Sequence, residues 1–307
     1  MSAPIKETAP LPAGRSVAKV PVRPDDRRGE GVVLNVFSHG FLALWALLIL
    51  LPLLWLVLSS FKTDAQIGGS AFGWPEHWSL DVFSRAWHKG IGDYFLNTLI
   101  VLVFSVPLTM LFGSMAAYVL ARYRFWGNRL LYYFFVAGAM FPVFLALVPL
   151  FFMVKRLDML NTYQGLILVY IAYSMPFTVF FMHSFFRTLP TAVFEAAILD
   201  GASHTRTFFQ VMLPMAKPGL ISVGIFNTLG QWNQFILPTV LMQPQSGSDP
   251  ERYVLTQGLI QLQQQQGYAS DLPVLFAGVT IAMIPMLVVY LSFQRQVQAG
   301  LTSATLK

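Results

Sequence analysis

The sequence predicts an all-α membrane protein with six transmembrane helices and both termini in the cytoplasm. Hydrophobic residues make up 55% of its 307 residues and charged residues only 11%, and the mean hydropathy is +0.59. A soluble domain carries about 25% charged residues, so the composition indicates a membrane protein. Six apolar runs without Asp, Glu, Lys or Arg then set the number of spans, and the distribution of Lys and Arg sets the orientation.

Each apolar run is close to the ~20 residues that a helix needs to cross the hydrocarbon of a bilayer. The predicted spans are 39–61, 95–121, 130–154, 164–182, 219–242 and 272–293. With the N-terminus inside, 14 of the 20 Lys and Arg residues fall in the inner segments 1–38, 122–129, 183–218 and 294–307. Basic residues gather on the cytoplasmic side of membrane proteins. The net charge of +6 therefore needs no nucleic acid to explain it.

The N-terminal segment 1–36 is rich in Pro, Ala and charged residues. Such a composition cannot bury enough apolar surface to fold. We therefore expect residues 1–36 to form a disordered cytoplasmic tail and residues 37–307 to form the membrane domain.

A polar island at 190–218 separates the fourth and fifth spans and is predicted to form two short helices. Proline is tolerated at the first helical position, so the first helix can begin at Pro190, and Gly201 is suited to end it. Ser203 can cap the second helix, which must end by Pro214 because proline cannot continue the hydrogen-bond ladder.

The first helix of this island carries an apolar face with helical spacing, flanked by two acids. The face holds Phe194, Ala197, Ile198 and Gly201, and the acids are Glu195 and Asp200. A helix this short is not stable alone, so it must pack against something. Two interpretations remain open: a helix lying on the lipid headgroups, and a docking site for a cytoplasmic partner.

The fifth span carries an unusual cluster of amides around an aromatic residue: Asn227, Gln231, Trp232, Asn233 and Gln234. Asn227, Gln231 and Gln234 follow i, i+4, i+7, which predicts that they share one side of a helix. Amides in lipid must find hydrogen-bond partners, so they either join neighbouring helices or line a path for a polyhydroxylated solute. Amides with an aromatic ring are what a sugar requires, and both interpretations stay open.

The outer loop 243–271 contains a glutamine run at 263–266. Glutamine runs are typical of low-complexity segments. Leu255, Leu259 and Leu262 nevertheless keep a helical spacing, so a short external helix is an equal alternative.

The sequence lacks the residues that several kinds of chemistry require. The chain has no cysteine and no metal-ligand cluster, and no Gly is followed by Lys, so it lacks the phosphate-binding loop of an ATPase. We therefore expect no enzyme activity, no bound metal and no cofactor. A stand-alone carrier or channel for small polar solutes is the alternative function, but ion-coupled carriers usually place acids or histidines within their spans. Energy for transport would then enter from outside the chain, through the loop 190–218.

The polar island resembles the EAA loop of ABC-importer permeases. The matching residues are Glu195-Ala196-Ala197, Asp200-Gly201-Ala202, Phe208 and Leu213-Pro214. Ala117-Tyr118, Phe185-Phe186-Arg187, Trp232-Asn233-Gln234-Phe235 and the ending Gln294-Arg295 with Gly300-Leu301-Thr302 resemble the carbohydrate branch, which includes the smaller permease subunit of maltose-type systems. Gln234 stands where that branch usually has an acid.

This resemblance implies a type I ABC-importer permease fold in a bacterial inner membrane. It implies three partners: a second homologous permease, an ATP-binding cassette ATPase dimer that carries ATP and Mg, and an extracellular solute-binding protein. The solute would be a mono- or oligosaccharide, of the N-acetylglucosamine/chitobiose or the maltose type. Within a coupling loop at 186–218, the residues implied to contact the ATPase are Phe194, Glu195, Ala196, Ala197, Ile198, Asp200 and Gly201.

Overall fold

The computed structural model describes residues 28–246, 251–265 and 271–305, and their regular secondary structure is entirely helical. The chain divides into two units, 1–53 and 54–307. The first unit consists, in its described part, of most of helix α1 (Arg28–Ser59), whose apolar stretch Asn35–Ser59 is long enough to cross a membrane.

The predicted tail 1–36 needs a correction where α1 begins. Residues 1–27 lie outside the described part of the chain, but Arg28 to Val36 are helical rather than disordered. No proline lies between Pro24 and Pro52. Because nothing removes a backbone donor in this stretch, the helix of the first span continues beyond its apolar part.

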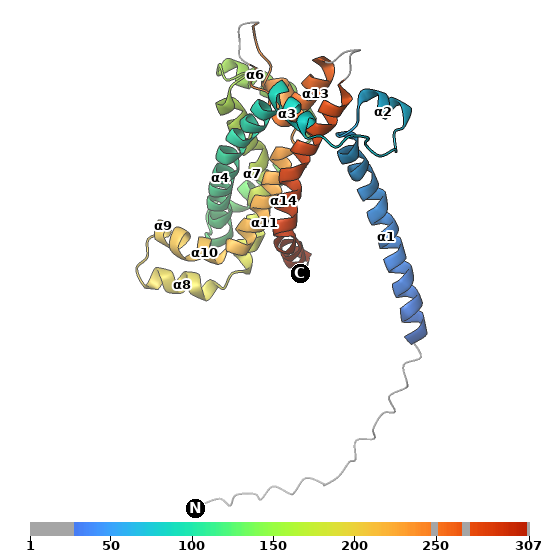
Figure 1. The fold of residues 1–307 in the computed structure, drawn as a ribbon. Coiled ribbons are helices and arrows are strands. Elements are labelled where there is room, and N and C mark those ends of the chain that lie inside the picture. The colour runs from blue at the N-terminus through green and yellow to red at the C-terminus, as the bar shows by residue number, and fades with distance from the viewer. Residues whose placement is uncertain (1–27, 247–250, 266–270, 306–307) are drawn as a thin grey trace, which may run out of the picture. The chain divides into compact units, whose positions relative to one another are not determined.

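The second unit is built on three long helices and one shorter one: α4 (Gly92–Arg122), α7 (Tyr163–Thr188), α14 (Leu272–Thr305) and α11 (Lys217–Trp232). Figure 1 shows α4, α7, α11 and α14 running side by side. Gly113 allows α4 to approach α7 closely, since a Cβ built there would lie 2.5 Å from Cγ2 of Thr178. Small residues at such crossings let membrane helices pack backbone to backbone.

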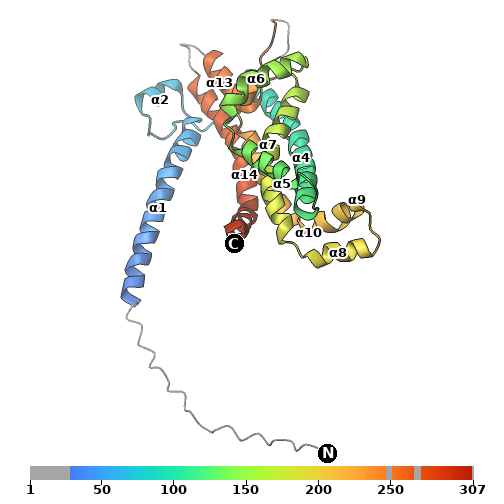
Figure 2. The same cartoon turned by 180° about the vertical axis from the view of Figure 1, so that it is seen from behind.

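Two predicted spans are broken rather than continuous. The run 130–154 forms α5 (Asn128–Met140) and α6 (Val143–Arg156), which meet at 102°. Pro142 lacks a backbone N–H, and Phe141 before it is extended, so the helix cannot pass through this point. Figure 2 shows α5 beside α7 from behind.

The run 219–242 is also divided, into α11 and the short α12 (Ile236–Leu241). The described residues contain four helices long and apolar enough to cross a membrane, or up to six when each of two bent pairs counts as one span: α5 with α6, and His204–Met215 with α11. The prediction of an all-α membrane fold is confirmed. Which side of the membrane holds the termini stays a prediction.

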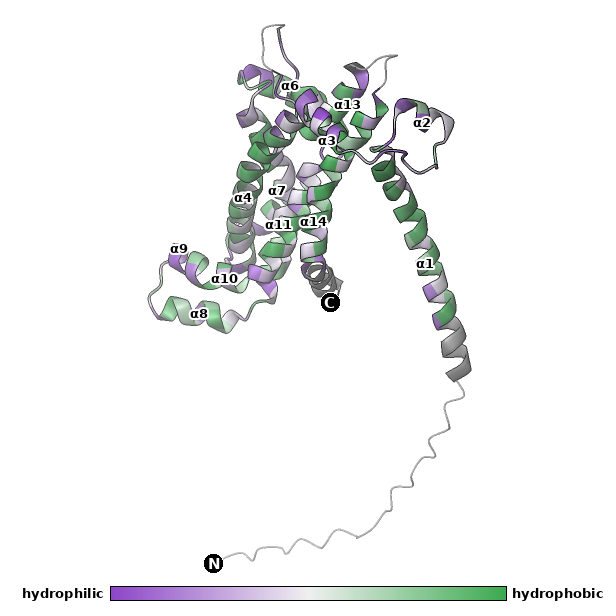
Figure 3. Ribbon diagram, viewed as in Figure 1, coloured by the Kyte–Doolittle hydropathy of each residue, from purple (hydrophilic) through white to green (hydrophobic). Residues whose placement is uncertain are grey.

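Short helices gather at the two ends of the second unit (Figure 1). At one end lie α3 (Asp81–Ala86), η1 (Trp87–Ile91), α6 and α13 (Leu255–Gln265), while α2 (Asp64–Gly69) follows α1 along the chain. At the other end lie α8 (Thr191–Leu199), α9 (His204–Arg206), η2 (Thr207–Met212) and α10 (Leu213–Met215). Figure 3 shows apolar residues along the long helices and more polar ones towards these ends. We call these two ends of the second unit the α13 end and the α8 end.

Residues 255–265 of the glutamine-rich loop form α13, so the helix alternative is confirmed for this segment. Leu255 and Leu262 of α13 are buried, and Leu259 packs beside them in the same apolar cluster. The side chain of Thr98 on α4 accepts a hydrogen bond from the backbone of Leu255 at 2.8 Å. The spacing of the leucines, rather than the glutamine content, therefore determines the secondary structure of this segment.

Candidate functional site

Helix α8 begins and ends where local signals place its limits. Pro190 is the N-cap with an extended backbone, and the helix runs from Thr191 to Leu199. Gly201 follows with φ +77°, a conformation that glycine adopts far more readily than other residues. The backbone N–H groups of Gly201 and Ala202 donate to the carbonyls of Ile198 and Ala197 at 3.0 Å, which closes the helix.

The second helix of the loop differs from its prediction at one point. Ser203 caps it as expected, with its Oγ accepting from the N–H of Arg206 at 3.3 Å. The helical stretch then passes through Pro214 to Met215, one residue beyond the predicted limit. The wide π-type turn over Thr207–Met212 shifts the backbone hydrogen bonds, so that Pro214 falls where its missing N–H breaks no regular ladder.

Arg122, the last residue of α4, fixes the start of this loop. Its Nη2 donates to the carbonyls of Phe186 and Leu189, at 2.6 and 2.7 Å. Its Nη1 donates to the hydroxyl of Thr191 at 3.3 Å. These bonds cap the end of α7, where carbonyls lack the regular helical partner. The end of α4, the end of α7 and the start of α8 are thereby joined by one guanidinium group.

Phe194 joins α8 to the same framework from inside the loop. Its ring lies 5.8 Å from that of Tyr123 and 6.3 Å from that of Tyr118, centroid to centroid. Tyr118 in turn packs on Phe208 of η2 at 5.1 Å. The aromatic cluster ties the two helices of the loop to α4.

The predicted apolar face of α8 is therefore divided between inside and outside. Phe194 and Ala197 are half-buried against the rest of the chain, whereas Ile198 is exposed. Glu195, Ala196, Asp200 and Gly201 are exposed as well. Sequence reasoning missed Leu199, which is 86% exposed. The signal was available, because Val193, Ala196 and Leu199 recur every third residue on the outward side of the helix.

The amides of α11 are placed in two different environments. Asn227 and Gln231 are each only 4% exposed and face α4 and α7. The Nδ2 of Asn227 donates to the hydroxyl of Thr178 at 2.8 Å, and the Nε2 of Gln231 donates to that of Ser174 at 3.0 Å. Ser105 on α4 donates to Oε1 of Gln231 at 2.5 Å. These two amides join three helices, as the packing interpretation expects.

Asn233 and Gln234 lie beyond the end of the helix. α11 ends at Trp232, whose ring is buried against Phe95 at 5.6 Å, centroid to centroid. Gln234 therefore does not continue the side shared by Asn227 and Gln231, and the i, i+4, i+7 prediction is wrong for it. Asn233 is exposed, and its Nδ2 donates back to the carbonyl of Leu229 at 2.9 Å. It is the only one of the five cluster residues with an exposed side chain.

The α13 end holds a second group of hydrogen-bonded polar side chains. Asn97 of α4 donates to the carbonyl of Tyr253 at 2.9 Å and accepts from the hydroxyl of Tyr163 at 2.6 Å. Arg252 donates to the carbonyl of Asn161 at 3.0 Å. Burial and the nearby Glu251 carboxylate raise the pKa of Tyr253 above its ordinary value. These contacts hold the segment before α13 against α4 and α7.

A bundle of helices long and apolar enough to cross a membrane defines a multi-pass membrane protein. The family described as "Binding-protein-dependent transport system inner membrane component" matches residues 109–303. The chain belongs to this family and is a multi-pass inner-membrane protein.

Two similar proteins are permeases of sugar-uptake systems. The chain is 48% identical, over 88% of its own length and 88% of the relative's, to the diacetylchitobiose uptake system permease protein NgcG of Streptomyces coelicolor. It is 32% identical to the multiple sugar-binding transport system permease protein MsmG of Streptococcus mutans, over 89% and 98% of the two chains. The resemblance to carbohydrate ABC-importer permeases is therefore confirmed.

A solved structure shares the fold. A chain of a bacterial ABC transporter involved in the import of the acidic polysaccharide alginate superposes with a TM-score of 0.73. The match covers 90% of this chain and 99% of that one, at 23% sequence identity. At this identity the likeness supports the fold alone, and it confirms the ABC-importer permease architecture.

Proposed function

We propose that this chain is the membrane subunit of an importer for a short oligosaccharide of N-acetylglucosamine, of the diacetylchitobiose type. The observation that carries this proposal is the 48% identity to NgcG along nearly the whole chain. The maltose-type alternative has weaker support, because the other sugar-transport relative described above is only 32% identical.

Uptake by cells tests this choice of solute. A deletion of the gene should abolish accumulation of radiolabelled N,N′-diacetylchitobiose at micromolar concentration, and a plasmid copy should restore it. Accumulation of labelled maltose in the same strains is the internal control and should not change. Loss of maltose uptake with normal diacetylchitobiose uptake would contradict the proposed solute while leaving the family intact.

The proposed system has three further components: a second homologous permease, an ATP-binding cassette ATPase dimer and an extracellular solute-binding protein. The family description, which names binding-protein-dependent transport, supports the last of these. The chain has no phosphate-binding loop, so ATP and Mg belong to the ATPase, and this subunit has no cofactor and no enzymatic activity of its own.

Helix α8 is the proposed contact with the ATPase, on the cytoplasmic side. Glu195, Ala196, Ile198, Asp200 and Gly201 are exposed there, and Leu199 adds a large apolar side chain to the same surface. Phe194 and Ala197 serve instead as the inner anchor of the helix. When the ATPase closes, a pull on α8 would pass through Arg122 and the aromatic cluster to α4 and α7. Such rigid-body movement opens the path to alternate sides of the membrane.

The proposed solute path runs past the end of α11. Asn233 has an exposed amide for a sugar hydroxyl, with Trp232 and Gln234 beside it at the break. Asn227 and Gln231 shape the path from behind by holding α11 against α4 and α7. In this proposal Asn233 contacts the sugar, whereas Asn227 and Gln231 position α11.

Asn233→Ala is expected to weaken apparent sugar affinity roughly five-fold, the effect of losing about one neutral hydrogen bond. Transport by the reconstituted complex over a range of sugar concentrations measures it. Gln243→Ala is the matched control, because Gln243 is also exposed and also donates to a carbonyl four residues earlier, that of Thr239 at 2.9 Å. Equal affinities for Asn233→Ala, Gln243→Ala and the unaltered protein would remove Asn233 from the solute path.

A further inference from the structure

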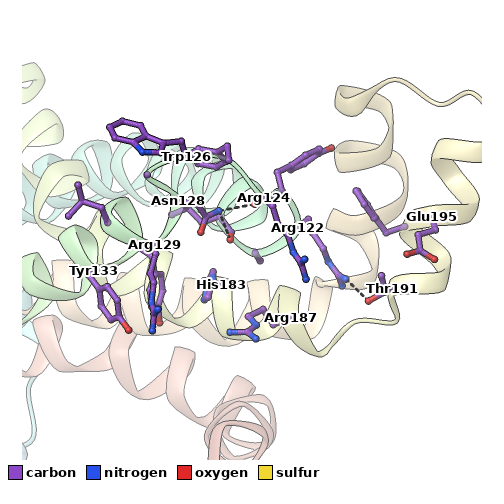
Figure 4. Close-up of a pocket in the computed structure, with 18 residues that line it drawn as sticks. Arg122, Arg124, Trp126, Asn128, Arg129, Tyr133, His183, Arg187, Thr191 and Glu195 are labelled. Carbon is purple, nitrogen blue, oxygen red and sulfur yellow. Dashed lines mark hydrogen bonds between the residues drawn. The ribbon is translucent and has the colours of Figure 1, made fainter.

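A cavity of about 1240 Å³ lies at the α8 end, beside the proposed docking surface, with which it shares Glu195, and away from the solute path. Its walls come from the segment between α4 and α5, the C-terminal part of α7 and the start of α8 (Figure 4). All of these elements belong to the second unit. We call it the basic cavity, because four arginines line it: Arg122, Arg124, Arg129 and Arg187.

The charge of the basic cavity is unbalanced. Glu195 is the one acidic residue among those that line it. Arg122 is occupied by the carbonyls at the end of α7. Arg124, Arg129 and Arg187 form no ion pair with any carboxylate in the described part of the chain. Three guanidinium groups around one cavity attract an anion, and guanidinium geometry is suited to phosphate.

The walls of the cavity are held in place by hydrogen bonds. The Nδ2 of Asn128 donates to the carbonyls of Leu120 and Tyr123, at 3.1 and 2.8 Å, which folds the linker back onto the end of α4. Gly127 permits this turn with φ +85°. The site is therefore formed before any ligand arrives, and a ligand need not order the linker when it binds.

His183 supplies a second and independent sign of a ligand. Its side chain lines the cavity between Arg129 and Arg187 in Figure 4 and is 7% exposed. Its buried Nδ1 has no hydrogen-bond partner among the described residues. A ligand hydroxyl can both donate and accept a hydrogen bond, so it can pair with Nδ1 in either tautomer of the imidazole.

The rim of the cavity points to a membrane lipid rather than a free anion. Trp126 is 97% exposed in this chain, and Leu130 and Tyr133 are exposed on the α5 side. Tryptophan and tyrosine favour the level of the lipid headgroups. Basic cavities between membrane helices on the cytoplasmic side are suited to anionic headgroups. Acyl chains could then lie along the apolar outer face of α5.

We propose that the basic cavity binds the headgroup of an anionic phospholipid that carries both a phosphate and a hydroxyl, as phosphatidylglycerol does. Arg129 and Arg187 bind the phosphate, and Nδ1 of His183 forms a hydrogen bond with a headgroup hydroxyl. The bound lipid links α5, α7 and the start of α8 at the membrane surface. This site is independent of which sugar the protein transports.

The test uses the complete transporter complex in nanodiscs that contain phosphatidylcholine and a small fraction of phosphatidylglycerol. Native mass spectrometry measures the bound phosphatidylglycerol relative to phosphatidylcholine. For the double variant Arg129→Gln/Arg187→Gln we expect a loss of roughly 30-fold in this preference, since each basic residue near an anionic surface contributes roughly five-fold. The lysine pair, Arg129→Lys/Arg187→Lys, should retain most of it.

Matched controls separate the site from general surface charge. Arg206→Gln removes a cation on the same side of the membrane but outside the cavity, where the Arg206 side chain donates to Gln210, and it should change nothing. The His183 ring lies 4.1 Å from the Tyr132 ring, centroid to centroid, and His183→Phe keeps a ring in that place. This variant should remove the preference for phosphatidylglycerol over phosphatidic acid, which has no headgroup hydroxyl.

Several results would overturn the proposal. One is an unaltered complex with no preference for phosphatidylglycerol, a measurement that needs no variant to fold. Another is displacement of the lipid by millimolar inorganic phosphate, which would assign the site to a free anion. A third is loss of the ATPase subunit from the glutamine pair with lipid binding unchanged, which would assign these arginines to the subunit interface.

Discussion

Gly201→Val is expected to reduce sugar uptake to background while the protein still reaches the membrane. Gly201 has φ +77° at the end of α8. A β-branched residue in this left-handed conformation is disfavoured by roughly 1–2 kcal/mol or more. The chain would relieve this strain by moving the end of α8, and with it the exposed Ile198 and Leu199. Uptake in cells, with immunoblotting of the membrane fraction, measures both effects.

The structure offers a close control for this substitution. Gly127 also has positive φ, +85°, and like Gly201 it has no atom within 4 Å of the place where a Cβ would lie. Gly127→Val therefore introduces similar strain on the same side of the membrane, but away from α8. Gly201→Asn, which tolerates this conformation better, should retain part of the uptake. If Gly201→Val and Gly127→Val reduced uptake equally, the special role of α8 in coupling would be wrong.

Gly113→Leu is expected to have the largest effect on stability. A Cβ at this position would lie 2.5 Å from Cγ2 and 2.9 Å from Cβ of Thr178. A larger side chain would force α4 away from α7, and overpacking of this kind costs about 1–3 kcal/mol or more. It would also pull Thr178 from its hydrogen bond with Asn227. The thermal unfolding midpoint of the detergent-solubilised protein, followed by size-exclusion chromatography, should fall markedly.

Two further variants separate a steric cause from a general loss of a glycine. Gly224 of α11 has no atom within 4 Å of a Cβ, so Gly224→Leu should be tolerated. The smaller substitution Gly113→Ala adds only a Cβ against Thr178 and should also lower stability. Thr178→Ser removes Cγ2 but keeps the hydroxyl, so adding it to Gly113→Ala should restore part of the lost stability. Independent effects of the two substitutions, with no compensation, would contradict direct contact between these positions.

Local signals predicted a large part of this protein. The six apolar runs predicted where membrane-crossing helices lie, because the need to satisfy backbone groups in lipid leaves few alternatives to a helix. Pro190, Gly201 and Ser203 marked the limits of the two loop helices, because each acts on its own backbone. The motifs around Glu195 and Trp232 were sufficient to predict the family.

The failures follow from contacts between distant segments. The spacing of Asn227, Gln231 and Gln234 assumed a continuous helix, but α11 ends at Trp232. Phe194 looked like an outward docking residue, yet Tyr118 and Tyr123 draw it inward. The residues next to Trp232 and Phe194 in the sequence do not indicate these results, because each depends on which distant segment the helix packs against.

The sequence by itself determined the helical membrane fold, the two-helix loop between two spans and the permease family. Hydropathy, proline and glycine act over a few residues and do not depend on the rest of the chain. The tertiary structure alone decided which amides are buried, which face of α8 is free, and that Arg129, His183 and Arg187 line one cavity. These features join residues from separate helices, and only the packing of those helices brings them together.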